Sequence, residues 1–117
     1  PRADIPKEFF TTPVSKSPVL LLSGGIDPVT PTRNGEQMAK ALGSKARHIS
    51  VDNLGHGVLM YGCVREVVDK FLAAKSDDEA LKVDASCVRQ IPRPLVWLPP
   101  VSSNDSAATA EVKKAGE

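Results

Sequence analysis

The sequence predicts an α/β fold with two parallel strands and flanking helices. A continuous apolar run at 19–22 ends in Gly24 and Gly25, which is typical of a strand buried on both faces of a parallel sheet. The stretch 47–51 alternates as a second strand, and the residues between the two strands have helical spacing. A strand, a helix and a second strand in this order form the repeating unit of a parallel sheet.

Capping signals and apolar spacing place the helices. The first helix is expected over 31–42, with Thr30 as its N-cap, Pro31 at its first position and Gly43 at its end. A second helix, with one face packed on the sheet, is indicated by apolar residues at the spacing i, i+3, i+4, i+7 and i+8. These residues are Val64, Val67, Val68, Phe71 and Leu72. Residues 76–78 can cap a short third helix that runs through 81.

The chain divides into a lead-in, a folded part and a tail. Residues 1–17 contain three prolines and few periodic apolar positions, so we expect an irregular lead-in. Residues 18–94 carry the strand and helix patterns. Residues 95–117 are expected to be extended and then disordered, because 102–117 are small and polar. Since the chain begins with proline rather than methionine, we interpret it as a segment cut from a longer protein.

The composition excludes some classes of protein. The chain has 41% hydrophobic and 25% charged residues, which are ordinary proportions for one soluble globular domain. Its formal charge is +1 and no basic run could neutralise a row of phosphates, so no nucleic acid partner is expected. The longest apolar run, 19–22, is far short of the roughly 18 residues that a membrane span requires.

Two cysteines, Cys63 and Cys87, allow two interpretations. They could form a disulfide across a loop of modest length, or they could be two buried thiols of a cytosolic protein. The spacing of the two cysteines does not decide between these two interpretations. A zinc site is not favoured, because neither cysteine has a second ligand at the close spacing that metal sites use.

Asp27 and His56 are the residues best placed for chemistry. Each follows a predicted strand by a few residues, and the carboxyl ends of neighbouring parallel strands meet at one edge of a sheet. A carboxylate beside a histidine fixes the imidazole tautomer and stabilises the imidazolium that forms when the ring takes a hydroxyl proton. The glycines on both sides of His56 permit a tight turn, and Pro28 keeps Asp27 out of a helix.

Simpler interpretations of these residues stay open at this point. An aspartate between a strand and a proline is often only a turn residue, and a Gly-His-Gly sequence is more often a loop than a general base. His48 lies inside a strand pattern without an acidic partner at a comparable position. We therefore expect His48 to have a structural role.

Four stretches of the chain resemble a known family. The run 18–31, PVLLLSGGIDPVTP, followed by 47–57, RHISVDNLGHG, is similar to the end of alpha/beta-hydrolases of the tripeptidyl aminopeptidase and proline iminopeptidase type. The later run from 62–65, GCVR, to 84–94, DASCVRQIPRP, resembles the terminal extension of that group, the TAP-like C-terminal domain. Together the resemblance covers about 13–94.

The resemblance implies a set of functional expectations. Asp27 would be the acid and His56 the base of a catalytic triad. Cys63 and Cys87 would form a disulfide in an exported, periplasmic or secreted serine peptidase that acts on peptide N-termini, or in a related ester or amide hydrolase. No metal or organic cofactor is implied.

The chain lacks one part of that machinery. In alpha/beta-hydrolases the nucleophilic serine precedes the acid and the base, in a Gly-x-Ser-x-Gly turn, and no serine of this chain is flanked in that way. We therefore expect the nucleophile, the oxyanion donors and the earlier strands to come from a missing N-terminal part of the same hydrolase. The chain by itself is expected to be inactive.

Two other functions are compatible with parts of the sequence. The run Leu22 to Asp27 also resembles the Ser-Gly-Gly-x-Asp-Ser loop of ATP pyrophosphatases, although Pro28 occupies the place of the second serine and Pro31 delays the helix. The chain could also be a non-catalytic module. Because a two-stranded sheet rarely stands alone in water, such a module is expected to associate with a second copy of itself.

Overall fold

The computed structural model describes residues 4–12 and 14–98 of the chain. A 3-10 turn at Lys7–Phe10 interrupts the otherwise irregular lead-in, and residues 91–98 have no helix or strand. The disorder predicted for 102–117 lies outside the described residues. Among the helices of the described part, none is long and apolar enough to cross a membrane.

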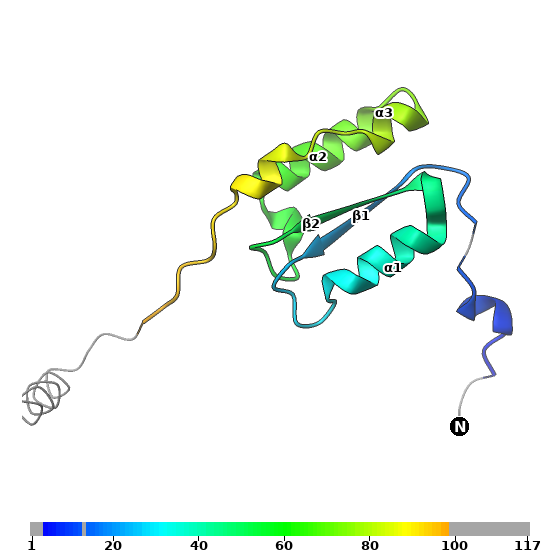
Figure 1. Ribbon diagram of the computed structural model, residues 1–117, viewed down its shortest axis with the longest axis horizontal. Helices are drawn as coiled ribbons and strands as arrows, with labels where there is room; N and C mark the ends of the chain where they lie inside the picture. The colour runs from blue at the N-terminus through cyan, green and yellow to red at the C-terminus, as the bar shows by residue number, and fades with distance from the viewer. Residues whose placement is uncertain (1–3, 13, 99–117) are drawn as a thin grey trace, which may run out of the picture.

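The two predicted strands form a parallel pair. Strand β1 (Val19–Gly24) and strand β2 (Ala46–Val51) are in register from Val19 opposite Ala46 to Gly24 opposite Val51. Helix α1 (Thr32–Leu42) lies between them in the chain and covers one face of the sheet, as Figure 1 shows. The predicted α/β fold is confirmed, and the chain leaves both strands at the same edge of the sheet.

Helix α1 begins one residue later than expected. Its N-cap residue is Pro31, which makes no side-chain capping hydrogen bond. The prediction that Thr30 caps the helix is therefore wrong, because Thr30 lies before the N-cap residue, in the turn around Asp27, where its hydroxyl donates to the Asp27 carboxylate. The predicted end of the helix is confirmed, because Gly43 is the C-cap residue and has a positive φ of 69°, which glycine adopts readily.

The opposite face of the sheet carries the hydrophobic core. Helix α2 (Gly62–Ala73), the short helix α3 (Asp77–Leu81) and the 3-10 turn η4 (Ser86–Gln90) lie on that side. Ser76 caps α3 as predicted, since its hydroxyl accepts from the backbone N–H of Glu79 at 3.2 Å. The buried core consists of Ile49, Val51, Leu54, Val58, Val64, Val67, Val83 and Val88.

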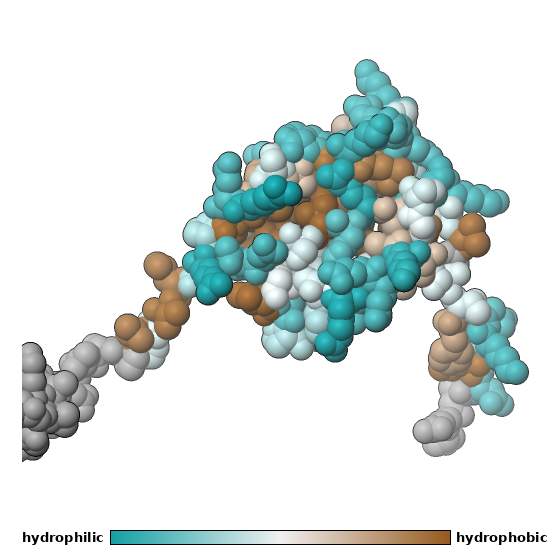
Figure 2. All heavy atoms as spheres, viewed as in Figure 1, coloured by the Kyte–Doolittle hydropathy of each residue, from teal (hydrophilic) through white to brown (hydrophobic). Residues whose placement is uncertain are grey.

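Two burial predictions are wrong. Leu72 was expected on the packed face of α2 but is 73% exposed, because no described element covers that end of the face. The apolar run 19–22 was expected to be buried on both faces of a sheet, yet its side chains are only half-buried. Strand β1 has one strand neighbour among the described residues, and hydrophobic side chains are visible at the surface over the strands in Figure 2.

His48 has the structural role expected of it. Its Nε2 atom lies 2.9 Å from the hydroxyl oxygen of Ser23 on the neighbouring strand, on the sheet face that α1 covers. Gly35 of α1 packs directly over this pair, and a Cβ atom at Gly35 would overlap with both side chains. The glycine therefore sets how closely α1 approaches the sheet.

We predict that Gly35→Ala lowers the stability of the protein. Alanine normally stabilises a helix relative to glycine, but here overpacking against Ser23 and His48 outweighs that gain, with a net loss of about 1 kcal/mol or more. Urea unfolding would measure the loss. Gly62→Ala is the matched control, because a Cβ atom at Gly62 would meet nothing within 4 Å. A Gly35→Ala variant as stable as the wild type would contradict the prediction.

Candidate active site

The loops that follow β1 and β2 are joined through their backbones. The N–H of Gly25 donates to the carbonyl of Val51 at 2.9 Å, and the N–H of Ile26 donates to the carbonyl of Leu54 at 3.1 Å. The loop that contains Asp27 therefore runs directly along the start of the loop that contains His56.

Gly24 and Gly25 make this approach possible. A Cβ atom at Gly24 would overlap with the backbone of Leu54 and Gly55, and one at Gly25 would overlap with the backbone of Asp52. Because the obstacles are backbone atoms, they could not move aside as a flexible side chain could. Any other residue at either glycine would force the two loops apart.

The structure brings the two predicted site residues together. The Nδ1 atom of His56 lies 2.8 Å from Oδ2 of Asp27. The Asp27 side chain is only 3% exposed, whereas the imidazole is 67% exposed. The buried carboxylate thus holds one ring nitrogen, and the ring itself stands at the surface of the described part.

Asp27 accepts further hydrogen bonds that favour its ionised form. The hydroxyl of Thr30 donates to Oδ2 at 2.5 Å, and the backbone N–H groups of Val29 and Thr30 donate to Oδ1 at 2.8 and 3.2 Å. The Thr30 hydroxyl lowers the pKa of Asp27 most; burial opposes this shift, and the Val29 N–H and the His56 ring add to it. The pKa of Asp27 is held well below its ordinary value, so Asp27 is a carboxylate at neutral pH.

Thr30 is the site residue that the sequence did not identify. Its hydroxyl oxygen lies 2.5 Å from Oδ2 of Asp27 and 3.2 Å from Nδ1 of His56, so it contacts both members of the pair. A turn around Asp27 was indicated by the sequence, since an aspartate side chain commonly accepts from the backbone N–H two residues on, but that pattern does not specify that the Thr30 hydroxyl joins it. Because Thr30 precedes Pro31, it also fits the pattern of a helix cap, and the two patterns predict different roles for its hydroxyl.

The loop after β1 does not provide a phosphate site. The backbone N–H groups of Gly25, Ile26 and Asp27 all donate to backbone carbonyls, and the Ser23 hydroxyl is paired with His48. A phosphate-binding loop needs such groups free to point at the ligand. The resemblance to ATP pyrophosphatases therefore does not extend to the structure.

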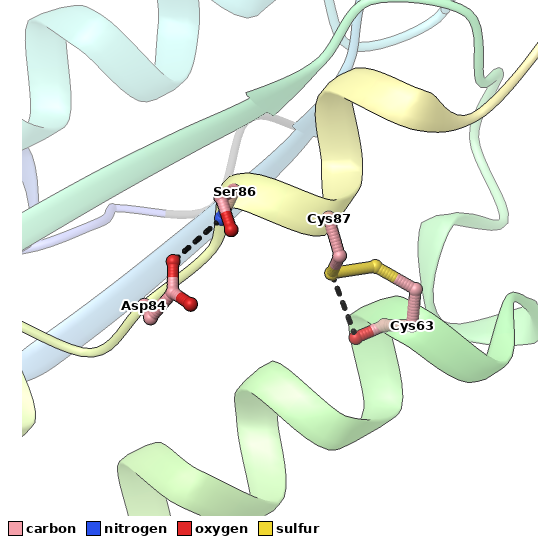
Figure 3. Close-up of a disulfide and its surroundings, with 4 residues drawn as sticks. All are labelled: Cys63, Asp84, Ser86 and Cys87. Carbon is pink, nitrogen blue, oxygen red and sulfur yellow. Dashed lines mark hydrogen bonds between the residues drawn. A yellow bond between two sulfur atoms is a disulfide. The ribbon is translucent and has the colours of Figure 1, made fainter.

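Cys63 and Cys87 lie at disulfide-bonding distance, with their Cα atoms 6.3 Å apart. Cys63 is in the first turn of α2 and Cys87 is in η4, as Figure 3 shows. Next to the pair, the carboxylate of Asp84 accepts from the backbone N–H of Ser86 at 2.9 Å, which fixes the start of η4. No group of three or more metal-ligating side chains is placed to hold an ion among the residues that the structure describes.

A parallel strand, helix and strand with a paired carboxylate and imidazole at the strand ends is an arrangement of the alpha/beta-hydrolase class. The model of the TAP-like protein family matches residues 2–87, which is more than half of the 117 residues. The chain belongs to this family, and the expected relationship is confirmed. No curated protein and no solved structure matched the chain.

We predict that Thr30→Val reduces the dependence of stability on acid pH. Because the folded-state pKa of Asp27 is below its unfolded value, its ionised form stabilises the fold fully above about pH 5, and this contribution is lost as the pH falls through the ordinary carboxyl range near about 4 and below. Without the hydroxyl the pKa of Asp27 rises toward its ordinary value. The loss of stability on acidification then becomes smaller.

Urea unfolding at a series of pH values would measure this difference. Thr30→Ser is the matched control, since it keeps a hydroxyl and should retain the acid dependence of the wild type. An unchanged acid dependence in Thr30→Val would show that the hydroxyl does not control the ionisation of Asp27.

Proposed function

We propose that the chain supplies the acid and the base of a serine hydrolase. The observation that carries this proposal is the 2.8 Å contact between Asp27 and His56. Membership of the TAP-like family supports a hydrolase role, and the low pKa of Asp27 suits an acid that must stay ionised while its histidine partner gains a proton.

In the proposed reaction a serine hydroxyl attacks a substrate carbonyl and His56 accepts its proton. With Nδ1 of His56 bonded to the Asp27 carboxylate, Nε2 is the nitrogen that takes this proton. His56 then gives the proton to the leaving group, which completes an acyl-enzyme. Water attacks the acyl group by the same route, and the serine is regenerated. Asp27 keeps the ring oriented and stabilises the imidazolium at both stages.

The nucleophile is proposed to come from another part of the same hydrolase. No serine of the chain has the flanking glycines of a nucleophile turn. Oxyanion donors, which lower the barrier by several kcal/mol in such enzymes, are proposed to come from the same part. The chain alone is then an incomplete catalyst.

The proposed substrate class is a peptide cleaved near its N-terminus, with ester or amide hydrolysis as the alternative. This proposal rests on the resemblance of 18–31 and 47–57 to aminopeptidases of that type. We further propose that Cys63 and Cys87 are bonded in an exported, periplasmic or secreted protein, because disulfides persist mainly in oxidising compartments. Their placement at bonding distance supports that location.

We predict that His56→Ala in the full-length enzyme lowers turnover by about 10⁴-fold or more, because proton transfer from the serine is lost. Steady-state hydrolysis of a peptide amide, with the concentration of folded enzyme measured separately, would give the change. His48→Gln is the matched control, since His48 lies on the sheet face beneath α1 and should leave turnover close to that of the wild type. Near-normal turnover in His56→Ala would overturn the proposal.

The chain by itself is predicted to remain unlabelled by a fluorescent fluorophosphonate, which reacts with activated serines. The full-length enzyme is the positive control and should be labelled. Labelling of the chain alone would show that it contains a nucleophile after all.

Light scattering on the same preparation tests the predicted self-association of the chain. A monomer in solution would contradict that prediction.

A further inference from the structure

The loop that carries His56 is tied at both ends to one segment of the chain. The loop is 52–61, between β2 and α2, and Cys63 lies just beyond its end in the first turn of α2. The segment is 86–91, which contains η4. The two are far apart in sequence, so their contacts are tertiary and not a consequence of local turn geometry.

The first tie is a hydrogen bond at the start of the loop. The side-chain amide of Asn53 donates to the backbone carbonyl of Ile91 at 2.8 Å. This contact is partly buried, and Ile91 also packs against the hydrophobic core. The bond therefore connects the residue just before Leu54 to a fixed part of the structure.

The second tie is at the end of the loop. Cys63 lies at bonding distance from Cys87, and Figure 3 shows this bridge joining α2 to η4. The residue after Cys87, Val88, is 9% exposed and belongs to the core. The segment is thus anchored in the core between its two contacts with the loop.

The imidazole has little packing of its own to hold it. The side chain of His56 is 67% exposed, whereas Leu54 and Val58 on either side of it in the loop are 2% and 8% exposed. The position of the ring therefore depends on its bond to Asp27 and on where the loop backbone is held. A shift of the loop would move the ring away from the carboxylate.

We propose that segment 86–91 is a brace that positions His56, and that Asn53, Cys63 and Cys87 are positioning residues of the active site. This inference rests on the proposed function of His56 as the base. The brace adds two ties, one covalent and one a hydrogen bond, to the backbone bond between Ile26 and Leu54 that joins the two loops. Neither tie contacts the reacting atoms.

The test uses the full-length hydrolase and three variants. Asn53→Asp keeps the size of the side chain but removes the N–H donors that reach Ile91. The double variant Cys63→Ala with Cys87→Ala removes the covalent tie. Arg47→Met is the matched control, because it removes a bond of the same kind, from the Arg47 guanidinium to the carbonyl of Leu81 at 2.6 Å, and neither residue belongs to the loop or to segment 86–91.

Two readouts separate positioning from simple stability. Steady-state kinetics gives kcat and KM, and the low-field proton spectrum reports the hydrogen bond between Nδ1 of His56 and Asp27. In Asn53→Asp and in the double variant we expect kcat to fall by about 10- to 100-fold with KM within about twofold, because a small misplacement of a catalytic group costs this much. The low-field signal should broaden or disappear. Arg47→Met should lose thermal stability but keep both kcat and the signal.

The outcomes distinguish the brace from the proposed function. If Asn53→Asp and the double variant lose only stability, as Arg47→Met does, and keep the low-field signal, the brace is overturned. If His56→Ala retains turnover while the tie variants still lose the signal, the proposed function fails and the brace stands as a structural device. Reduction of the wild type by dithiothreitol should reproduce the double variant, and reoxidation should restore kcat; failure of either would contradict the covalent tie.

Discussion

The site depends on the contact between two backbone segments where β1 and β2 end. The parallel register places Gly24 opposite Val51, so the chain leaves both strands at the same level. The absence of side chains at Gly24 and Gly25 then lets the two loops form direct backbone hydrogen bonds. This contact brings Asp27 close to His56, because Asp27 lies only two residues beyond Gly25. Backbone geometry therefore brings the carboxylate and the imidazole together.

Asp27 and His56 differ in solvent exposure, and this difference suits the proposed chemistry. Asp27 is buried and accepts from a hydroxyl, two backbone N–H groups and the imidazole, so groups of the protein stabilise its charge. The imidazole is mostly exposed, which leaves its second nitrogen accessible to an incoming group. A histidine can take up a proton and return it when a fixed carboxylate holds one ring nitrogen and the other ring nitrogen is accessible. Thr30 strengthens that condition, because it contacts both partners.

Local patterns in the sequence were sufficient for the strands, for the end of α1 at Gly43 and for the cap of α3 at Ser76, because each depends on residues close in the chain. The pairing of Asp27 with His56 could also be predicted, since parallel topology alone brings the ends of neighbouring strands together. Thr30 was misassigned because a hydroxyl before Pro31 fits a helix cap as well as a turn around Asp27, and only the folded geometry decides between them. The exposure of Leu72 and the bond from Asn53 to Ile91 depend on which distant segment covers a surface, and no local pattern contains that information.

The apolar side chains of strand β2 are buried more deeply than those of strand β1. Strand β2 places Ile49 and Val51 in the core at 7% and 0% exposure. Strand β1 has the longer apolar run, 19–22, yet its side chains stay half-buried. Apolar area left at the surface is unfavourable by roughly 25 cal/mol for each Å², so β1 has the stronger tendency to bind a further element. The apolar side chains at 19–22 are thus the part of the sheet that its described neighbours leave least covered.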